Sequence, residues 1–202
     1  MPPLSALFKE QPTLMRLILI ITLLSLIESC KYELNEKDLQ WNPYKKGDKL
    51  TFISNEGYVD TITITEIENY TQAKNNIQKV MCEYSPDKRT NSLKSSTFFL
   101  ALTAIKDNSV LSLNFPMGNG KFIPYITKRI SQMDSTPKST YILDSIKLND
   151  LVSLSPTLGS RMVDRSSNVT FVTSIQWSKS NGLISYHTNN NTHWKLKAKY
   201  RL

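Results

Sequence analysis

The chain ends in a segment whose side chains alternate more strictly than anywhere else, and this segment constrains the fold most. Between residues 193 and 201, aromatic or aliphatic side chains alternate with histidine, lysine and arginine. A period of two with one apolar and one charged face is typical of a β-strand that covers a core on one side. A one-residue slip would exchange the faces, so the pattern also fixes how the strand pairs. The C-terminus is therefore predicted to end an antiparallel meander.

Two turn signals predict the register of this meander. An Asn-Gly dipeptide at 181–182 favours a two-residue hairpin turn. Pairing outward from it places Trp177 opposite Tyr186. The same register places Gln176 opposite His187, which separates an apolar face from a polar face.

The second turn signal is a run of three asparagines at 189–191. Asparagine tolerates the left-handed backbone conformation that a three-residue loop requires. This loop pairs Tyr186 with Trp194 in the core, and it pairs His187 with His193 on the outer face. Together the two turns predict an inner row of three aromatic rings and an outer pair of imidazoles.

Upstream segments indicate the same class of structure. Short runs rich in β-branched and aromatic residues are separated by turn residues, and no convincing helical pattern appears. The predicted strands are 50–54, 58–67, 80–84, 97–105, 110–115 and 141–148. We expect an all-β domain over residues 49–202, built as an antiparallel sandwich or a strongly curved sheet. The Ser- and Lys-rich stretch 128–140 is predicted as a loop.

Residues 15–29 have the pattern of an export signal. Arg16 precedes an apolar run over 17–27, which is shorter than the roughly 20 residues that a membrane-spanning helix needs. The segment 26–30 resembles the lipobox of bacterial lipoproteins, in which the cysteine receives a diacylglycerol and the signal is cut off before it. The resemblance implies lipidation at Cys30 and anchoring in a lipid bilayer. The alternative is a simple cleaved signal followed by an ordinary cysteine.

The segments on either side of the signal differ in character. Residues 1–14 contain prolines and an acid, and we interpret them as a mis-annotated extension in front of a start at Met15. Residues 30–48 are polar and are predicted as the acylated N-terminus and a tether. Trp41 and Tyr44 are expected to dock on the domain and end the tether.

The formal charge of +8 belongs to the part after the signal, because acids and bases balance over residues 1–29. A basic exported domain favours anionic envelope polymers, lipid headgroups or nucleic acid, whereas the alternative is an ordinary solvated surface. With Cys30 acylated, Cys82 has no disulfide partner, and it is predicted to be a buried strand residue. We predict no cofactor, since no phosphate-binding or metal motif appears.

A basic stripe is predicted on the outer face of the last strand: Lys195, Lys197, Lys199 and Arg201. At a sheet edge it would block strand addition. In an anchored domain it would also contact anionic headgroups. Nucleic acid is a poor candidate, because the aromatic side chains lie on the opposite face.

His187 and His193 are the chain's two imidazoles. Facing each other, they are weak candidates for metal ligands, because a zinc site needs three or four ligands. This pair defines the alternative function, a metal-assisted hydrolase. A carboxylate or third ligand converging on the pair in a concave pocket would favour the hydrolase, and a flat face would favour a non-enzymatic binding or structural module.

The two ends of the chain carry a further resemblance. The segment 177–186, followed by Trp-Lys-Leu at 194–196, resembles the ending of uncharacterised cell-envelope lipoproteins of the Bacteroidetes. Residues 41–44 and Asp-Thr-Ile at 60–62 extend the likeness. The resemblance implies location and β architecture only, which here means a lipid-anchored protein of the outer membrane, and it implies no activity. Apart from the resemblance, we expect an envelope protein or an anionic polymer as partner, the latter because the exported domain is basic. Separately, Asp-Ser-Thr at 134–136 resembles the short acceptor pattern for O-glycosylation in the Bacteroidetes, which makes Ser135 a candidate site.

Overall fold

The computed structural model describes residues 21, 31–87, 96–114, 125–143, 146–156 and 170–200. Cys30 and Arg201 lie outside these residues, as do 1–14 and, apart from residue 21, the predicted signal 15–29. Within the described residues, no helix has the length and apolar character that crossing a bilayer requires.

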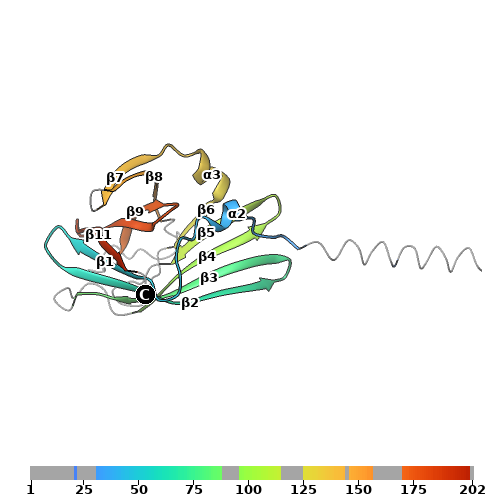
Figure 1. Cartoon of the computed structure of the whole chain (residues 1–202), viewed down its shortest axis with the longest axis horizontal. Helices are drawn as coiled ribbons and strands as arrows, with labels where there is room; N and C mark the ends of the chain where they lie inside the picture. The colour runs from blue at the N-terminus through green and yellow to red at the C-terminus, as the bar shows by residue number, and fades with distance from the viewer. Residues whose placement is uncertain are drawn as a thin grey trace, which may run out of the picture.

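Among the described residues, eleven strands form one antiparallel sheet, with almost no helix beside it (Figure 1). Its order is β6-β5-β4-β3-β2-β1-β11-β10-β9-β8-β7, so both halves are meanders and β1 and β11 pair between them. The all-β prediction and the strongly curved sheet are confirmed. The strands are β1 (Lys49–Ser54), β2 (Val59–Gln72), β3 (Asn75–Ser85), β4 (Ser96–Ile105), β5 (Asn108–Asn114), β6 (Tyr125–Arg129), β7 (Ser139–Leu143), β8 (Ile146–Leu154), β9 (Val172–Ser178), β10 (Gly182–Thr188) and β11 (His193–Tyr200).

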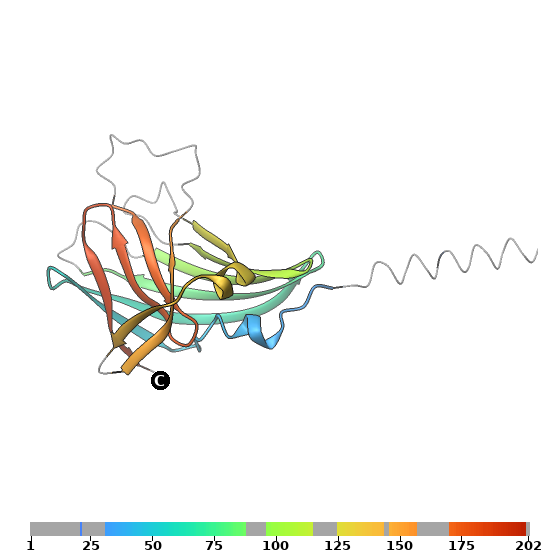
Figure 2. The ribbon, with the colours of Figure 1, turned by 90° about the horizontal axis from the view of Figure 1, so that it is seen from above.

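The connection between the two edge strands requires the sheet to curl. β6 and β7 lie at opposite edges, and residues 130–138 join them. In a flat sheet of 11 strands, the edges would lie about 48 Å apart. The connection from Arg129 to Ser139 reaches at most about 35 Å even when fully extended. The sheet therefore bends into a half-barrel, as Figure 2 shows.

A short helix in this connection replaces the loop predicted over 128–140. Helix α3 (Ile130–Ser135) buries Ile130 and Met133, which are three residues apart and therefore on one face of the helix. These two side chains join the core of the half-barrel. The predicted strand 141–148 is likewise two strands, β7 and β8, which form a hairpin.

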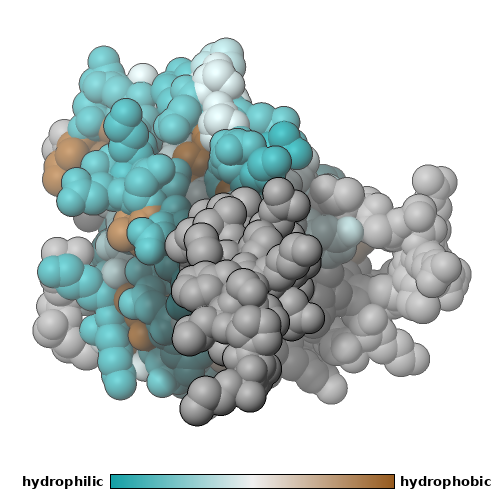
Figure 3. Space-filling view, turned by 90° about the vertical axis from the view of Figure 1, so that its right-hand side faces the viewer, coloured by the Kyte–Doolittle hydropathy of each residue, from teal (hydrophilic) through white to brown (hydrophobic). Residues whose placement is uncertain are grey.

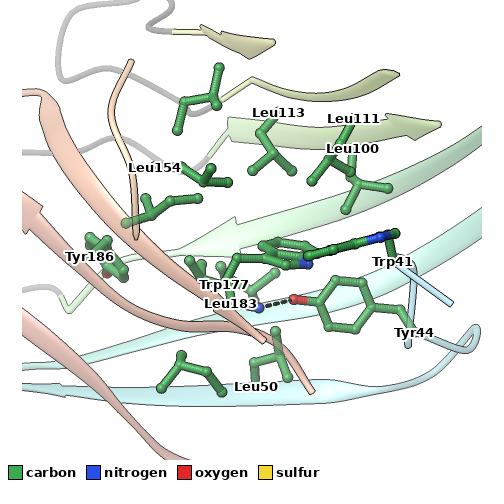
Figure 4. Close-up of a cluster of buried hydrophobic side chains, with 14 of the residues drawn as sticks. Trp41, Tyr44, Leu50, Leu100, Leu111, Leu113, Leu154, Trp177, Leu183 and Tyr186 are labelled. Atoms are coloured by element: carbon green, nitrogen blue, oxygen red, sulfur yellow. Dashed lines mark hydrogen bonds between the residues drawn. The ribbon is translucent and has the colours of Figure 1, made fainter. Parts of the chain in front are cut away.

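The core fills the concave side of the sheet (Figure 4). Alternate residues of the strands point into it, as along β5, where buried and half-buried side chains alternate. Cys82 is fully buried there, as predicted.

The segment before the sheet is folded against it from Tyr32 onwards. Helix α2 (Glu36–Leu39) begins at Asn35, whose side chain accepts a hydrogen bond from the Asp38 backbone N–H. Trp41 and Tyr44 are buried in the core, as predicted. The sequence predicted that the tether would contact the domain only at Trp41 and Tyr44, but the chain already packs against the sheet from Tyr32.

Candidate functional site

The β10–β11 hairpin has the predicted register. Tyr186 lies opposite Trp194, and His187 lies opposite His193. Asn191 has φ 62°, the left-handed conformation expected of an asparagine in this loop. The two inner rings stack with centroids 5.6 Å apart and planes 11° apart, and the imidazole centroids lie 4.1 Å apart.

The predicted register of the β9–β10 hairpin is wrong. Trp177 lies opposite Leu183, not Tyr186, and Gln176 lies opposite Ser185, not His187. The loop holds three residues, 179–181, because Ser178 pairs with residue 182. Trp177 is still buried with the other two aromatic rings, but its edge-on neighbour is Tyr44, at 5.8 Å between centroids.

The physical reason for the wrong register lies at Gly182. Its φ of 83° is costly for residues with a Cβ, and a Cβ there would overlap the ring and hydroxyl of Tyr44. The Tyr44 hydroxyl accepts a hydrogen bond from the Leu183 backbone N–H at 2.7 Å (Figure 4). The glycine therefore accommodates a distant tyrosine, in addition to ending the loop. Asp150 holds the same loop by accepting hydrogen bonds from the Ser180 backbone N–H and hydroxyl, each at 2.9 Å.

A shallow groove of about 240 Å³ borders the imidazole pair on the outer face of the sheet. It is lined by Ile53, Ser54, Asn55, His193 and Lys195. Asn55 is held against β11 by two hydrogen bonds to His193. Its side-chain oxygen accepts a hydrogen bond from the His193 backbone N–H at 2.9 Å, and its backbone N–H donates to the His193 carbonyl at 3.0 Å. The groove therefore presents the Lys195 ammonium and the His193 imidazole, both from β11, which these two hydrogen bonds hold beside the β1–β2 turn.

The pKa of His187 is lowered from its ordinary value by partial burial, by His193 and by Lys195. Proton binding at His187 is therefore disfavoured unless an anion offsets the neighbouring positive charge. Among the described residues, no group of three His, Cys, Asp or Glu side chains is placed to hold a metal ion. The pair thus has the geometry of an exposed polar patch, and no third ligand from the described part of the chain joins it.

The predicted basic stripe is interrupted. A bulge pairs Thr51 with Ala198 and Phe52 with Leu196, which leaves Lys197 as the extra residue of β11. Beyond the bulge Lys199 lies opposite buried Leu50.

Lys199 has therefore turned away from the other lysines. Its ammonium lies 3.8 Å from the Asp48 carboxylate, which is fully buried, and 5.0 Å from the centre of the Tyr44 ring. Lys195 and Lys197 are exposed. The strand is also central, between β1 and β10, so the predicted role in protecting an edge is wrong.

A buried polar cluster on the inner face was not predicted. The Asp60 carboxylate is fully buried and accepts hydrogen bonds from the hydroxyls of Tyr84 and Tyr186, the latter at 2.6 Å, and from the Asp87 backbone N–H at 2.9 Å. Burial raises the Asp60 pKa, while the two tyrosine hydroxyls oppose that rise. The cluster links β2 and β3 to β10 across the concave side. An acid at an inward position of a strand is the one signal that the sequence offers for it.

Ser135, the predicted O-glycosylation site, is exposed at the end of α3. Its hydroxyl donates to the carbonyls of Ser131 and Gln132 at 3.1 and 3.0 Å. The serine therefore lies on a helix end and not in the predicted loop.

Comparison with known proteins gives no relative from which a role can be transferred. No family model matches the chain, and no curated protein or solved structure is significantly similar to it.

Proposed function

We propose that this protein is a lipoprotein of the bacterial cell envelope, anchored in the outer membrane through an acylated Cys30. The short apolar run before Cys30 supports an export signal, and the likeness of the chain's two ends to Bacteroidetes lipoproteins points the same way. The described fold begins to pack at Tyr32, so a lipid on Cys30 would be attached beside the domain and outside its core.

Metabolic labelling with an alkyne analogue of palmitate tests the anchor. The wild-type protein should be labelled and recovered with membranes, and Cys30→Ala should be neither. Cys82→Ala is the matched control and should keep the label, because Cys82 is fully buried. Equal labelling of wild type and Cys30→Ala, or a soluble wild-type protein, would reject the proposal.

We propose further that the domain is a non-enzymatic binding module for an anionic envelope component. The observation that carries this proposal is the groove that joins Lys195 and His193 to the imidazole of His187. A sulfate, phosphate or carboxylate group bound there would pair with the Lys195 ammonium and favour protonation of His187. The hydrolase alternative has no comparable support, since no described third ligand meets the pair.

Dextran sulfate is a suitable probe, with neutral dextran as its control. Because the chain has two histidines, proton NMR gives two imidazole Cε1–H signals, one from each ring, and dextran sulfate should shift both. Lys195→Gln should weaken binding by roughly two- to fivefold, and the exposed Lys147→Gln should leave it unchanged. Because the His187 pKa is lowered below its ordinary value of 6.5, affinity should rise as the pH falls below that value and His187 becomes protonated. Equal binding of both dextrans, or an unchanged affinity in Lys195→Gln, would contradict the proposal.

A further inference from the structure

The chain enters the fold at a turn of the sheet. The Tyr32 backbone N–H donates to the Lys74 carbonyl at 2.7 Å, and the Asn76 backbone N–H donates to the Tyr32 carbonyl at 3.0 Å. These two bonds form a parallel bridge between Tyr32 and Asn75, beside the turn that joins β2 to β3. The first described contact of the chain with the sheet is therefore made by backbone at one end of the two longest strands.

The bridge leaves little chain between the sheet and the proposed anchor. One residue separates Cys30 from Tyr32, so their Cα atoms lie at most about 7 Å apart. Acyl chains on Cys30 must lie in the hydrocarbon layer, which holds the backbone of Cys30 at the headgroup level. A domain attached by so short a connection cannot stand away from the bilayer, and the β2–β3 turn must lie close to the headgroups.

Two neighbouring turns share this end of the half-barrel. β3 pairs with β4 so that Ile77 lies opposite Thr103, which brings the β2–β3 turn beside the β4–β5 turn (Figures 1 and 2). We call these turns, at 73–74 and 106–107, together with residues 31–37, the entry end.

The surface of the entry end suits headgroups better than hydrocarbon. In the view onto this end, hydrophilic side chains dominate the described surface (Figure 3). Lys31, Lys74 and Lys106 are exposed on its three parts. Exposed Glu33 and Asp107 lie there too, so the charges largely offset each other. The contact between the entry end and the membrane therefore depends on the lipid anchor and not on net charge.

We propose that the entry end rests on the lipid headgroups and holds the half-barrel upright, with the histidine groove facing away from the membrane. This inference rests on the proposed lipid anchor. β2 has 14 residues and runs from the entry end to the β1–β2 turn at 55–57, which adjoins the groove. At 3.3 Å per residue it spans about 45 Å, so an upright sheet presents the groove well beyond the bilayer surface.

Site-specific fluorescence quenching tests this orientation on the acylated protein. Lys74→Cys and Glu56→Cys place one label on the entry end and one on the opposite turn, both at exposed positions. Buried Cys82 and acylated Cys30 leave the parent protein as an unlabelled control. The variants are reconstituted into vesicles of phosphatidylethanolamine and phosphatidylglycerol that carry nitroxide headgroups. Quenching at position 74 should be several-fold stronger than at position 56.

A spacer variant shows whether the short connection causes the contact. Inserting about 12 Gly and Ser residues after Lys31 adds roughly 20 Å of flexible reach and should abolish most quenching at position 74 while the protein stays on the vesicles. Equal quenching at the two positions, or quenching that survives the spacer, would overturn the orientation and leave the anchor standing. A wild-type protein that does not float with vesicles would overturn the anchor, and the orientation with it.

Discussion

The two faces of the β10–β11 hairpin carry similar pairs of rings with different consequences. On the inner face Tyr186 stacks on Trp194, and both are almost fully buried. On the outer face His187 lies against His193, which is exposed. The two pairs are adjacent in the same hairpin, and they point to opposite faces of the sheet. What differs is the water removed from each ring, which implies that the inner pair stabilises the fold and the outer pair is free to bind.

Trp194→Ala should have the largest effect on the comparison between the faces. It removes a buried indole and leaves a cavity against Tyr186, so the free energy of unfolding should fall by about 3–5 kcal/mol. Urea melts followed by circular dichroism measure the loss. Lys197→Ala on the exposed face is the control and should change stability by less than about 0.5 kcal/mol. Equally mild effects would mean that the two faces do not differ as the structure indicates.

Lys199→Ala should show that the basic stripe is divided between the faces. The substitution takes the ammonium away from the buried Asp48 carboxylate, and stability should fall by about 1–3 kcal/mol. Lys195→Ala removes a lysine that is still on the outer face and should cost less than about 0.5 kcal/mol. Urea midpoints of the two variants give the comparison, and indistinguishable midpoints would argue against the bulge at Lys197.

Tyr186→Phe should sharpen the comparison through its pH dependence. Burial raises the folded pKa of Asp60 above its ordinary value of 3.8, so this group makes folding less favourable as the pH rises through that range. The Tyr186 hydroxyl stabilises the ionised carboxylate, and its removal raises the Asp60 pKa further. The variant should lose about 1–2 kcal/mol at pH 7.5 and less at pH 4. A loss that is equal at both pH values would separate Tyr186 from the ionisation of Asp60.

The two hairpins of the C-terminal meander show what the sequence could predict. The β10–β11 register followed from the alternation of β11 and from an asparagine loop, both of which are local signals. The predicted β9–β10 register was wrong because it took Gly182 as part of a two-residue turn. In the structure Gly182 also makes room for the Tyr44 side chain, which comes from a distant part of the chain. A turn motif therefore predicts a hairpin more securely than it predicts the register.

The candidate site was predictable to the same limited degree. Pairing of the histidines could be predicted, since it depends on the register of one loop. The groove also needs Asn55, which comes from the β1–β2 turn and reaches β11 only because the first and last strands of the sheet pair. Likewise, the Asp60 cluster joins strands that lie far apart in the sheet order, and it follows from curvature that no local pattern encodes.

His187→Gln should have the smallest effect and completes the comparison from the outer face. Partial burial, His193 and Lys195 lower the folded pKa of His187 below its ordinary value of 6.5, so the unfolded chain binds protons more readily than the folded one. This group therefore makes folding less favourable as the pH falls below about 6.5, and glutamine removes that contribution. Urea melts should give equal stabilities near pH 8, within about 0.5 kcal/mol, and a variant that is slightly more stable than wild type near pH 5. A variant that loses several kcal/mol at pH 8 would show that the imidazole is part of the core, which would remove the distinction between the faces.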